Sequence, residues 1–185
     1  IRGGEARTIE LKRTLWGPVA PEPLLGHAVA IHWTALDADA VNVGMIDLEQ
    51  SESLEQALDI ANLTGGPQLN FMAADDNGQI AWTILGRIPQ RYGIDGSVSR
   101  SWADGTAGWN GYLDPAELPR QLDAPDGFLV SANDRRLGKH YPHVIGRQFT
   151  NGYRAYRISQ RLHQMPEATE RSMFELQLDD QSEFY

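Results

Sequence analysis

The spacing of apolar residues predicts several strands. Apolar and polar residues alternate over residues 8–12 and 27–33, as they do in a half-buried edge strand and in a central strand with a buried face. Both arms of residues 68–85 alternate in the same way, and the Asp-Asn-Gly sequence at 76–78 between them is typical of a hairpin turn. A short apolar run at residues 128–130 predicts one more strand.

Helical spacing marks other segments. Residues 53–62 place their apolar side chains on one face, with a serine at the start and glycines and a proline just beyond the end. Residues 153–165 have the spacing of a second helix, which Pro166 ends. Thr169 is suited to cap a last helix. This mixture of elements predicts an α+β fold.

The segment from about residue 86 to 125 predicts a loop-rich β subdomain. Its first part is dense in glycine, proline and aromatic residues and has no helical period. We expect Trp102, Trp109 and Tyr112 to fill tight turns as buried plugs. An exposed row of these rings would instead stack on sugars, so a non-catalytic carbohydrate- or peptide-binding β module is an alternative function.

The composition of the chain fits one globular domain and argues against several classes of function. The 185 residues are 41% hydrophobic and 22% charged, which is enough for a core. The net charge of −9 argues against a nucleic-acid partner, and no apolar run approaches the roughly 20 residues of a membrane span. The chain has no cysteine, which excludes disulfides and thiolate nucleophiles. Because it starts at Ile1 and ends at Tyr185, we expect residues 1–185 to be a single-domain piece of a longer protein.

Candidate chemistry gathers where the apolar run at 128–130 ends. Asn133 follows this run, and its amide N–H could stabilise an oxygen that becomes negative during acyl transfer. The other interpretation is that Asn133 only caps a turn. His140 and His143 have the spacing of metal ligands, so a metal hydrolase is a further hypothesis, although Pro142 interrupts them. No Gly-X-Ser-X-Gly elbow, phosphate loop or evident catalytic triad occurs in the sequence.

A series of short segments extends this picture. The segments are Trp16-Gly17-Pro18, residues 30–33, Leu69-Asn70-Phe71, residues 74–81, Gly86-Arg87-Ile88-Pro89 with Arg91 and Asp95-Gly96, residues 109–113 with Leu118-Pro119, residues 132–135, Tyr141-Pro142, and Tyr153-Arg154-Ala155 with Arg157-Ile158. In this order, over nearly the whole chain, they resemble the penicillin acylase family of N-terminal nucleophile (Ntn) hydrolases, which includes penicillin, cephalosporin and acyl-homoserine lactone acylases. The resemblance implies the central part of the β subunit, a fragment of the αββα fold with the small β subdomain inserted.

The resemblance implies hydrolysis of a linear amide, either the acyl side chain of a β-lactam antibiotic or that of an N-acyl-homoserine lactone. The family's nucleophile is an N-terminal serine freed by autoproteolysis, and its α-amine, with a pKa of roughly 8, serves as the base. Because this chain starts at Ile1, it lacks that serine, and we expect the fragment alone to be inactive.

The resemblance also implies partners and a location. They are an acyl-amide small-molecule substrate and the remaining α- and β-subunit segments of the same precursor, with no nucleic acid and no membrane. The implied location of the complete protein is periplasmic or secreted.

The same resemblance assigns roles to individual residues. Asn133 matches the asparagine of the oxyanion hole, and Arg157 matches the arginine that supports it, with Arg154 as the rival for that role. Trp33 and Leu69 match positions that line the acyl pocket, although both could equally be plain core residues.

A structural calcium ion is a further property of the family. The resemblance implies that it is held partly by a backbone carbonyl near Gly96, with acidic ligands from earlier in the β subunit. A ligand is also expected near Ile145, which carries no carboxylate. We therefore expect this chain to hold no cofactor, and we assign any calcium site to the full protein.

Overall fold

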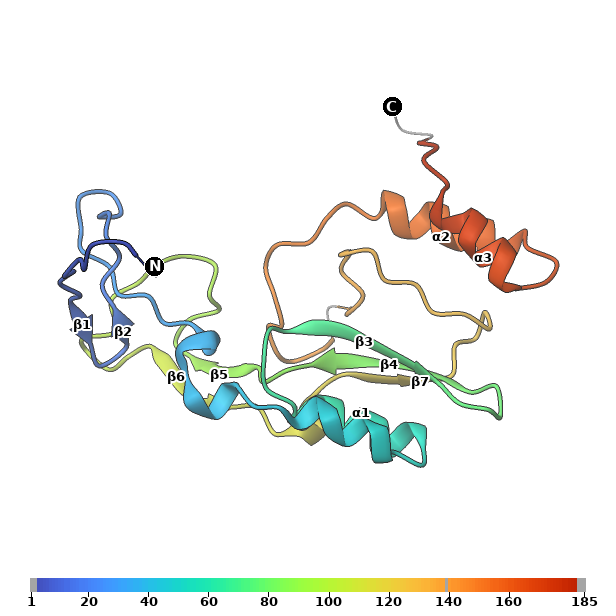
Figure 1. The fold of residues 1–185 in the computed structure, drawn as a ribbon, viewed down its shortest axis with the longest axis horizontal. Coiled ribbons are helices and arrows are strands. Elements are labelled where there is room, and N and C mark those ends of the chain that lie inside the picture. The colour runs from blue at the N-terminus through green and yellow to red at the C-terminus, as the bar shows by residue number, and fades with distance from the viewer. Residues whose placement is uncertain (1–2, 139, 183–185) are drawn as a thin grey trace.

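The computed structural model describes residues 3–138 and 140–182, and it shows a mixed arrangement of helices and small sheets (Figure 1). The strands are β1 (Arg13–Thr14), β2 (Gly17–Pro18), β3 (Leu69–Ala74), β4 (Ile80–Leu85), β5 (Pro89–Tyr92), β6 (Gly108–Tyr112) and β7 (Arg120–Leu122). The helices are α1 (Leu54–Leu63), α2 (Tyr153–His163) and α3 (Glu170–Gln177), with 3₁₀ helices η1 (Thr34–Leu36), η2 (Ala38–Ala40), η3 (Gly44–Gln50) and η4 (Pro115–Glu117). No helix in the described ranges is long and apolar enough to cross a membrane.

Strands β3, β4 and β7 form an antiparallel sheet with β4 in the middle. The pairing of β3 with β4 runs from Leu69 opposite Leu85 to Ala74 opposite Ile80. Gly78 supplies the positive φ of 81° in the turn between them, a conformation that costs a glycine little. The predicted hairpin is therefore confirmed.

Both faces of β4 are buried, and this explains why its sequence is apolar at consecutive positions. Helix α1 covers one face, where Leu58 belongs to a buried cluster with Ala81. On the opposite face, Trp82 joins a second cluster with Leu113 and Leu118, covered further by side chains from the segment after β7. A strand buried on both sides loses the alternation of a half-buried strand.

Helix α1 forms where the sequence predicts it. The hydroxyl of Ser53 accepts a hydrogen bond from the backbone N–H of Gln56 at 3.1 Å and so caps the first turn. After the helix, Gly65 lies so close to the segment before η3 that a Cβ there would stand 2.5 Å from the backbone nitrogen of Asn42. The helix ends where Thr64 becomes extended, and the glycine after it allows this close packing.

A buried asparagine links α1 to the sheet. The side-chain nitrogen of Asn62 donates to Thr83 Oγ1 and to the carbonyl of Ile84, both at 2.8 Å. Its oxygen accepts two bonds from Arg120 of β7, at 2.6 and 2.9 Å. Thr83 in turn donates to the carbonyl of Pro119 at 2.8 Å. All donor and acceptor capacity of this fully buried amide is used, which ties three elements together.

The segment from about 86 to 125 contains the antiparallel pair β5 and β6, together with β7, which belongs to the central sheet. Tyr112 at the end of β6 donates its hydroxyl to Asp37 at 2.5 Å, and the Arg87 guanidinium lies 4.9 Å from the centre of its ring. Burial and this hydrogen bond raise the pKa of Tyr112, and the same bond lowers the pKa of Asp37. These contacts fix the subdomain against η1 and η2.

Three predicted strands are wrong. Residues 8–12 and 128–130 have no strand, and only the two-residue pair β1 and β2 follows the first of them. Residues 27–33 make two isolated bridges, between Ala30 and Val19 and between His27 and Leu24, and are largely exposed. Alternation describes which side chains a strand would bury, but a strand also needs a continuous ladder of hydrogen bonds with a neighbour. Residues 27–33 form only separate bonds, such as that from the N–H of Ile31 to the Pro18 carbonyl at 2.8 Å.

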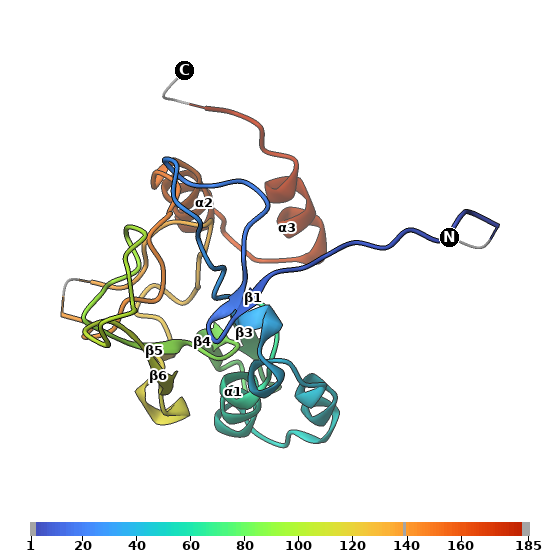
Figure 2. The ribbon, with the colours of Figure 1, turned by 90° about the vertical axis from the view of Figure 1, so that its left-hand side faces the viewer.

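The C-terminal helices confirm their predictions. Helix α3 begins with a capping box in which the Thr169 hydroxyl accepts from the N–H of Ser172 at 3.1 Å. Neither α2 nor α3 contains a buried residue. Figures 1 and 2 show both helices on the side of the central sheet opposite to α1.

We predict that Asn62→Ala destabilises the fold strongly. The change leaves Arg120 and Thr83 without their buried partner, which should lower the free energy of unfolding by about 3 kcal/mol. Urea unfolding of the complete protein would measure this, with exposed Asn110→Ala on β6 as the matched control. Equal unfolding midpoints for the two variants would show that the network does not stabilise the fold.

Candidate functional site

Asn133 lies in a tight turn rather than at the end of a strand. Its φ is 61°, in the left-handed region that asparagine tolerates better than most residues. The turn is closed by Asp134, whose carboxylate accepts from the N–H of Ala132 at 2.9 Å. The N–H of Thr150 donates to the Asn133 carbonyl at 2.8 Å. The backbone of this exposed residue is therefore held from both sides.

Arg154 in the first turn of α2 fixes the Asn133 side chain. One nitrogen of its guanidinium donates to Asn133 Oδ1 at 2.7 Å and to the carbonyl of Ala132 at 2.8 Å. With Oδ1 engaged in this way, the amide nitrogen Nδ2 points to the other side. Within the described residues no acceptor binds Nδ2, so this donor is available to a ligand.

Arg157, the arginine expected to support Asn133, lies elsewhere. Its guanidinium forms an ion pair of 2.9 Å with Asp179, which also binds Arg161 at 3.2 Å. It further donates to Gln181 at 2.8 Å. The physical reason is position along α2: Arg154 belongs to the turn next to residue 133, whereas Arg157 lies one turn further on, beside the segment that follows α3.

Trp33 and Leu69, the expected acyl-pocket positions, are both exposed, at 60% and 55%. They are therefore not core residues of this chain. Their neighbours join the two segments, because the Gln68 side chain donates to Thr34 Oγ1 at 3.4 Å and to the carbonyl of Arg87 at 2.6 Å. An apolar pair is thus presented where η1 approaches the start of β3.

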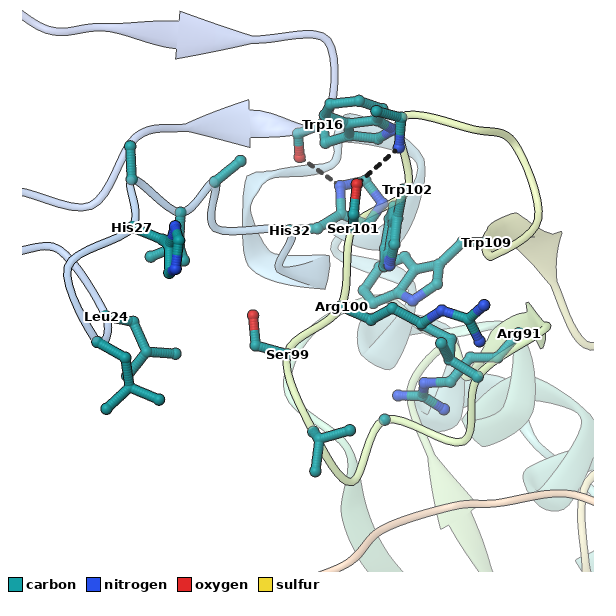
Figure 3. Close-up of a pocket in the computed structure, with 18 residues that line it drawn as sticks. Trp16, Leu24, His27, His32, Arg91, Ser99, Arg100, Ser101, Trp102 and Trp109 are labelled. Atoms are coloured by element: carbon teal, nitrogen blue, oxygen red, sulfur yellow. Dashed lines mark hydrogen bonds between the residues drawn. The ribbon is translucent and has the colours of Figure 1, made fainter.

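A hollow of about 760 Å³ lies between residues 16–32 and 91–109 (Figure 3). Its aromatic wall contains Trp102 and Trp109, whose ring centres are 6.3 Å apart, and His32, whose ring centre is 4.0 Å from that of Trp109. The tryptophans are half-buried and pack on one another, which favours the plug interpretation over an open sugar platform. The sequence revealed the aromatic density but not that His32 joins it.

Two arginine side chains lie around Gly96 and Ile145, the positions near which the family resemblance implies calcium ligands. The Arg91 guanidinium donates to the Val144 carbonyl at 3.1 Å, and Arg147 forms an ion pair with Asp95 and donates to its carbonyl at 3.3 Å. Guanidinium groups therefore bind backbone carbonyls of both segments, and carbonyl oxygens of this kind are ligands that calcium uses. Across residues 3–138 and 140–182, no three His, Asp or Glu side chains group as metal ligands.

The histidine pair of the metal-hydrolase hypothesis is also engaged differently. His143 lies 3.3 Å from the carboxylate of Glu117, and the hydroxyl of Tyr141 donates to the carbonyl of Glu117 at 2.6 Å. Burial, with the nearby charge of Glu117, raises the pKa of Tyr141 to about 12. These contacts attach the segment to η4, and they leave the metal-hydrolase hypothesis without support.

Comparison with known proteins places this geometry in a wider context. The family model described as penicillin amidase matches residues 1–185. Acyl-homoserine lactone acylase QuiP from Pseudomonas aeruginosa is 32% identical over 165 residues, which are 89% of this chain and 19% of that protein. Penicillin acylase 2 proenzyme from Pseudomonas sp. (strain SE83) is 28% identical over 168 residues, 90% of this chain and 22% of that protein.

A solved structure agrees in fold. Thermostable penicillin G acylase from Alcaligenes faecalis matches with a TM-score of 0.74 at 21% sequence identity, over 95% of this chain and 32% of that chain. The match confirms the expected fold class, a fragment of the larger Ntn-hydrolase fold. The chain spans only about a fifth of the length of the curated relatives it matches.

We predict that the two arginines of α2 stabilise different segments. Arg154→Leu removes the bonds to residues 132 and 133, so backbone hydrogen exchange of residues 131–136 should become faster. Arg157→Leu should instead speed exchange around residue 179. Mass spectrometry of both variants measures this, each serving as control for the other. Faster exchange at residues 131–136 in Arg157→Leu alone would contradict the assignment.

Proposed function

The chain belongs to the penicillin amidase family, and from this membership we propose that it is part of an amidohydrolase that cleaves a linear amide. The substrates would carry an acyl side chain, as β-lactam antibiotics and N-acyl-homoserine lactones do. The names of the relatives support this range, since they include acylases of both kinds. The nucleophile would be an N-terminal serine on a segment outside this chain.

The observation that carries the proposal is the orientation of the Asn133 amide. In the proposed reaction a serine Oγ attacks the amide carbonyl, its proton passes to an amine base, and the carbonyl oxygen becomes negative. Asn133 Nδ2 would donate a hydrogen bond to this oxygen. Collapse of the intermediate breaks the C–N bond, the proton goes to the leaving amine, and water then releases the acid.

Arg154 would act as the positioning residue of this group. Its bond to Asn133 Oδ1 orients the amide before substrate binds, and its charge draws electron density from the amide, which strengthens the N–H donor. Arg157, the first candidate from sequence, would support the same site indirectly by fixing α2 to the segment at Asp179.

The acyl chain would contact Trp33 and Leu69. The supporting facts are that both apolar side chains are exposed and that their segments are joined through the Gln68 side chain and Thr34. The remaining segments of the same precursor would complete this pocket and cover the free edge of β3. By family resemblance the complete protein would be periplasmic or secreted.

We also propose that this chain contributes no calcium ligands. The contacts of Arg91 and Arg147 support this, because guanidinium groups already join the two loops that a bound cation would join. Any calcium site of the complete protein would be formed by residues of its other segments.

Asn133→Ala in the complete protein should fold and lose about 10²- to 10³-fold in kcat, because one oxyanion donor is removed. Steady-state hydrolysis of an acyl-homoserine lactone and of a penicillin measures the loss. Asn110→Ala, an exposed asparagine on β6, is the matched control and should keep normal activity. Unchanged kcat in Asn133→Ala would remove this residue from the mechanism.

Trp33→Ala should change the preference for acyl chains while sparing stability, since the ring is exposed. Loss of its apolar contact should lower kcat/KM for long acyl chains about tenfold or more relative to short ones. A series of N-acyl substrates of increasing chain length tests this. Equal effects on short and long chains would show that Trp33 does not line the acyl pocket.

A further inference from the structure

The hollow of Figure 3 has a preformed apolar wall. Trp102 is the centre of this wall, with its ring 6.4 Å from that of Trp16 and 6.3 Å from that of Trp109. The His32 ring packs edge-on against both Trp102 and Trp109, and its Nδ1 bonds the Trp16 carbonyl. Leu24 belongs to the facing wall. Mutual packing of this kind holds the rings in place without a ligand.

The charge of the hollow is opposite to that of the chain. The chain carries 25 acidic and 16 basic residues, yet none of the lining residues is acidic, while Arg91 and Arg100 both line the hollow. The nearest acidic groups in sequence lie outside the lining: Asp95 pairs with Arg147, and Asp104 accepts from the side chain of Thr106 at 2.8 Å, although both charges also attract the two arginines. A pocket without carboxylates and with two guanidinium groups favours an anion.

Both arginines keep donors for a ligand. The Arg91 guanidinium lies 5.7 Å from the ring centre of Trp109, and one of its nitrogens donates a hydrogen bond to the Val144 carbonyl. Arg100 donates to the Gly93 carbonyl at 2.9 Å. Each guanidinium has five N–H groups in a planar fork, so further hydrogen bonds to a carboxylate can form. Figure 3 shows both side chains beside Trp109, next to the apolar wall.

We propose that this hollow binds an alkyl carboxylate. The apolar chain would lie against Trp102 and Trp109 and the aliphatic side chains opposite, and the carboxylate would meet Arg100 and Arg91. A volume of about 760 Å³ suits a small amphiphile, since ligand pockets commonly measure about 300–1,000 Å³. A neutral sugar would carry no charge to pair with either guanidinium group. The inference does not rest on the proposed hydrolysis.

Calorimetric titration of the complete protein with octanoate tests the proposal, with 1-octanol as the neutral probe of the same chain length. Arg100→Gln should weaken octanoate binding about tenfold or more, because a charge-assisted hydrogen bond is lost. Arg100 is exposed, so this variant should fold normally. The matched control is Arg171→Gln on α3, where the arginine is exposed and pairs with Glu175 one turn away, and it should bind like the parent protein.

Other outcomes overturn the proposal. Equal affinity for octanoate and 1-octanol, or an unchanged affinity in Arg100→Gln, would show that the arginines do not bind the carboxylate. Absence of octanoate binding to the complete protein would show that other segments fill the hollow. Asn133→Ala separates the two proposals: binding lost there and kept in Arg100→Gln would place octanoate at the acylase site and would leave the proposed function intact.

Discussion

The bond between Arg154 and the turn at Asn133 is the contact on which this account depends. Helices α2 and α3 bury no residue of their own, so they rely on a few specific contacts to keep their place against the rest of the chain. Arg154 provides such contacts at Ala132 and Asn133. The same bonds select one orientation of the asparagine amide. The Arg154 guanidinium thus both attaches α2 to the rest of the chain and orients the amide donor of Asn133.

The turn can present a fixed amide only because the sheet below it is rigid. Strand β4 is buried on both faces, and Asn62 joins α1, β4 and β7 through a fully used set of hydrogen bonds. The segment after β7 covers the second face of the sheet and then leads to Asn133. A donor carried by a packed layer loses little freedom when a ligand binds, which is the physical basis of preorganisation.

Local signals in the sequence predicted the parts of the fold that depend on local interactions. The hairpin follows from its Asn-Gly turn, α1 from the Ser53 cap and its apolar face, and α3 from Thr169. The predicted strand at 27–33 failed for the opposite reason: its alternation is real, but the neighbouring segment around Val19 meets it only in an isolated bridge and forms no continuous ladder. Strand pairing joins segments that are distant in sequence, and the periodicity of one segment carries no information about its partner.

The contacts of the candidate site also join segments that are distant in sequence, so the sequence alone could not predict all of them. Asn133 was found because an apolar run ends just before it and because the resemblance supplied a role. Arg154 and Arg157 are one helical turn apart, so sequence could not separate them, and only the position of the turn relative to α2 decides which one binds the amide. The aromatic hollow was missed because His32 and Trp109 are far apart in sequence.

The most direct test is a crystal structure of the complete protein with a boronic acid that mimics the tetrahedral intermediate of acyl transfer. The account predicts that an oxygen of the bound boronate lies about 2.7–3.1 Å from Asn133 Nδ2, with Arg154 still bonded to Asn133 Oδ1. A boronate oxygen bound by other groups, with the Asn133 amide facing solvent, would contradict it.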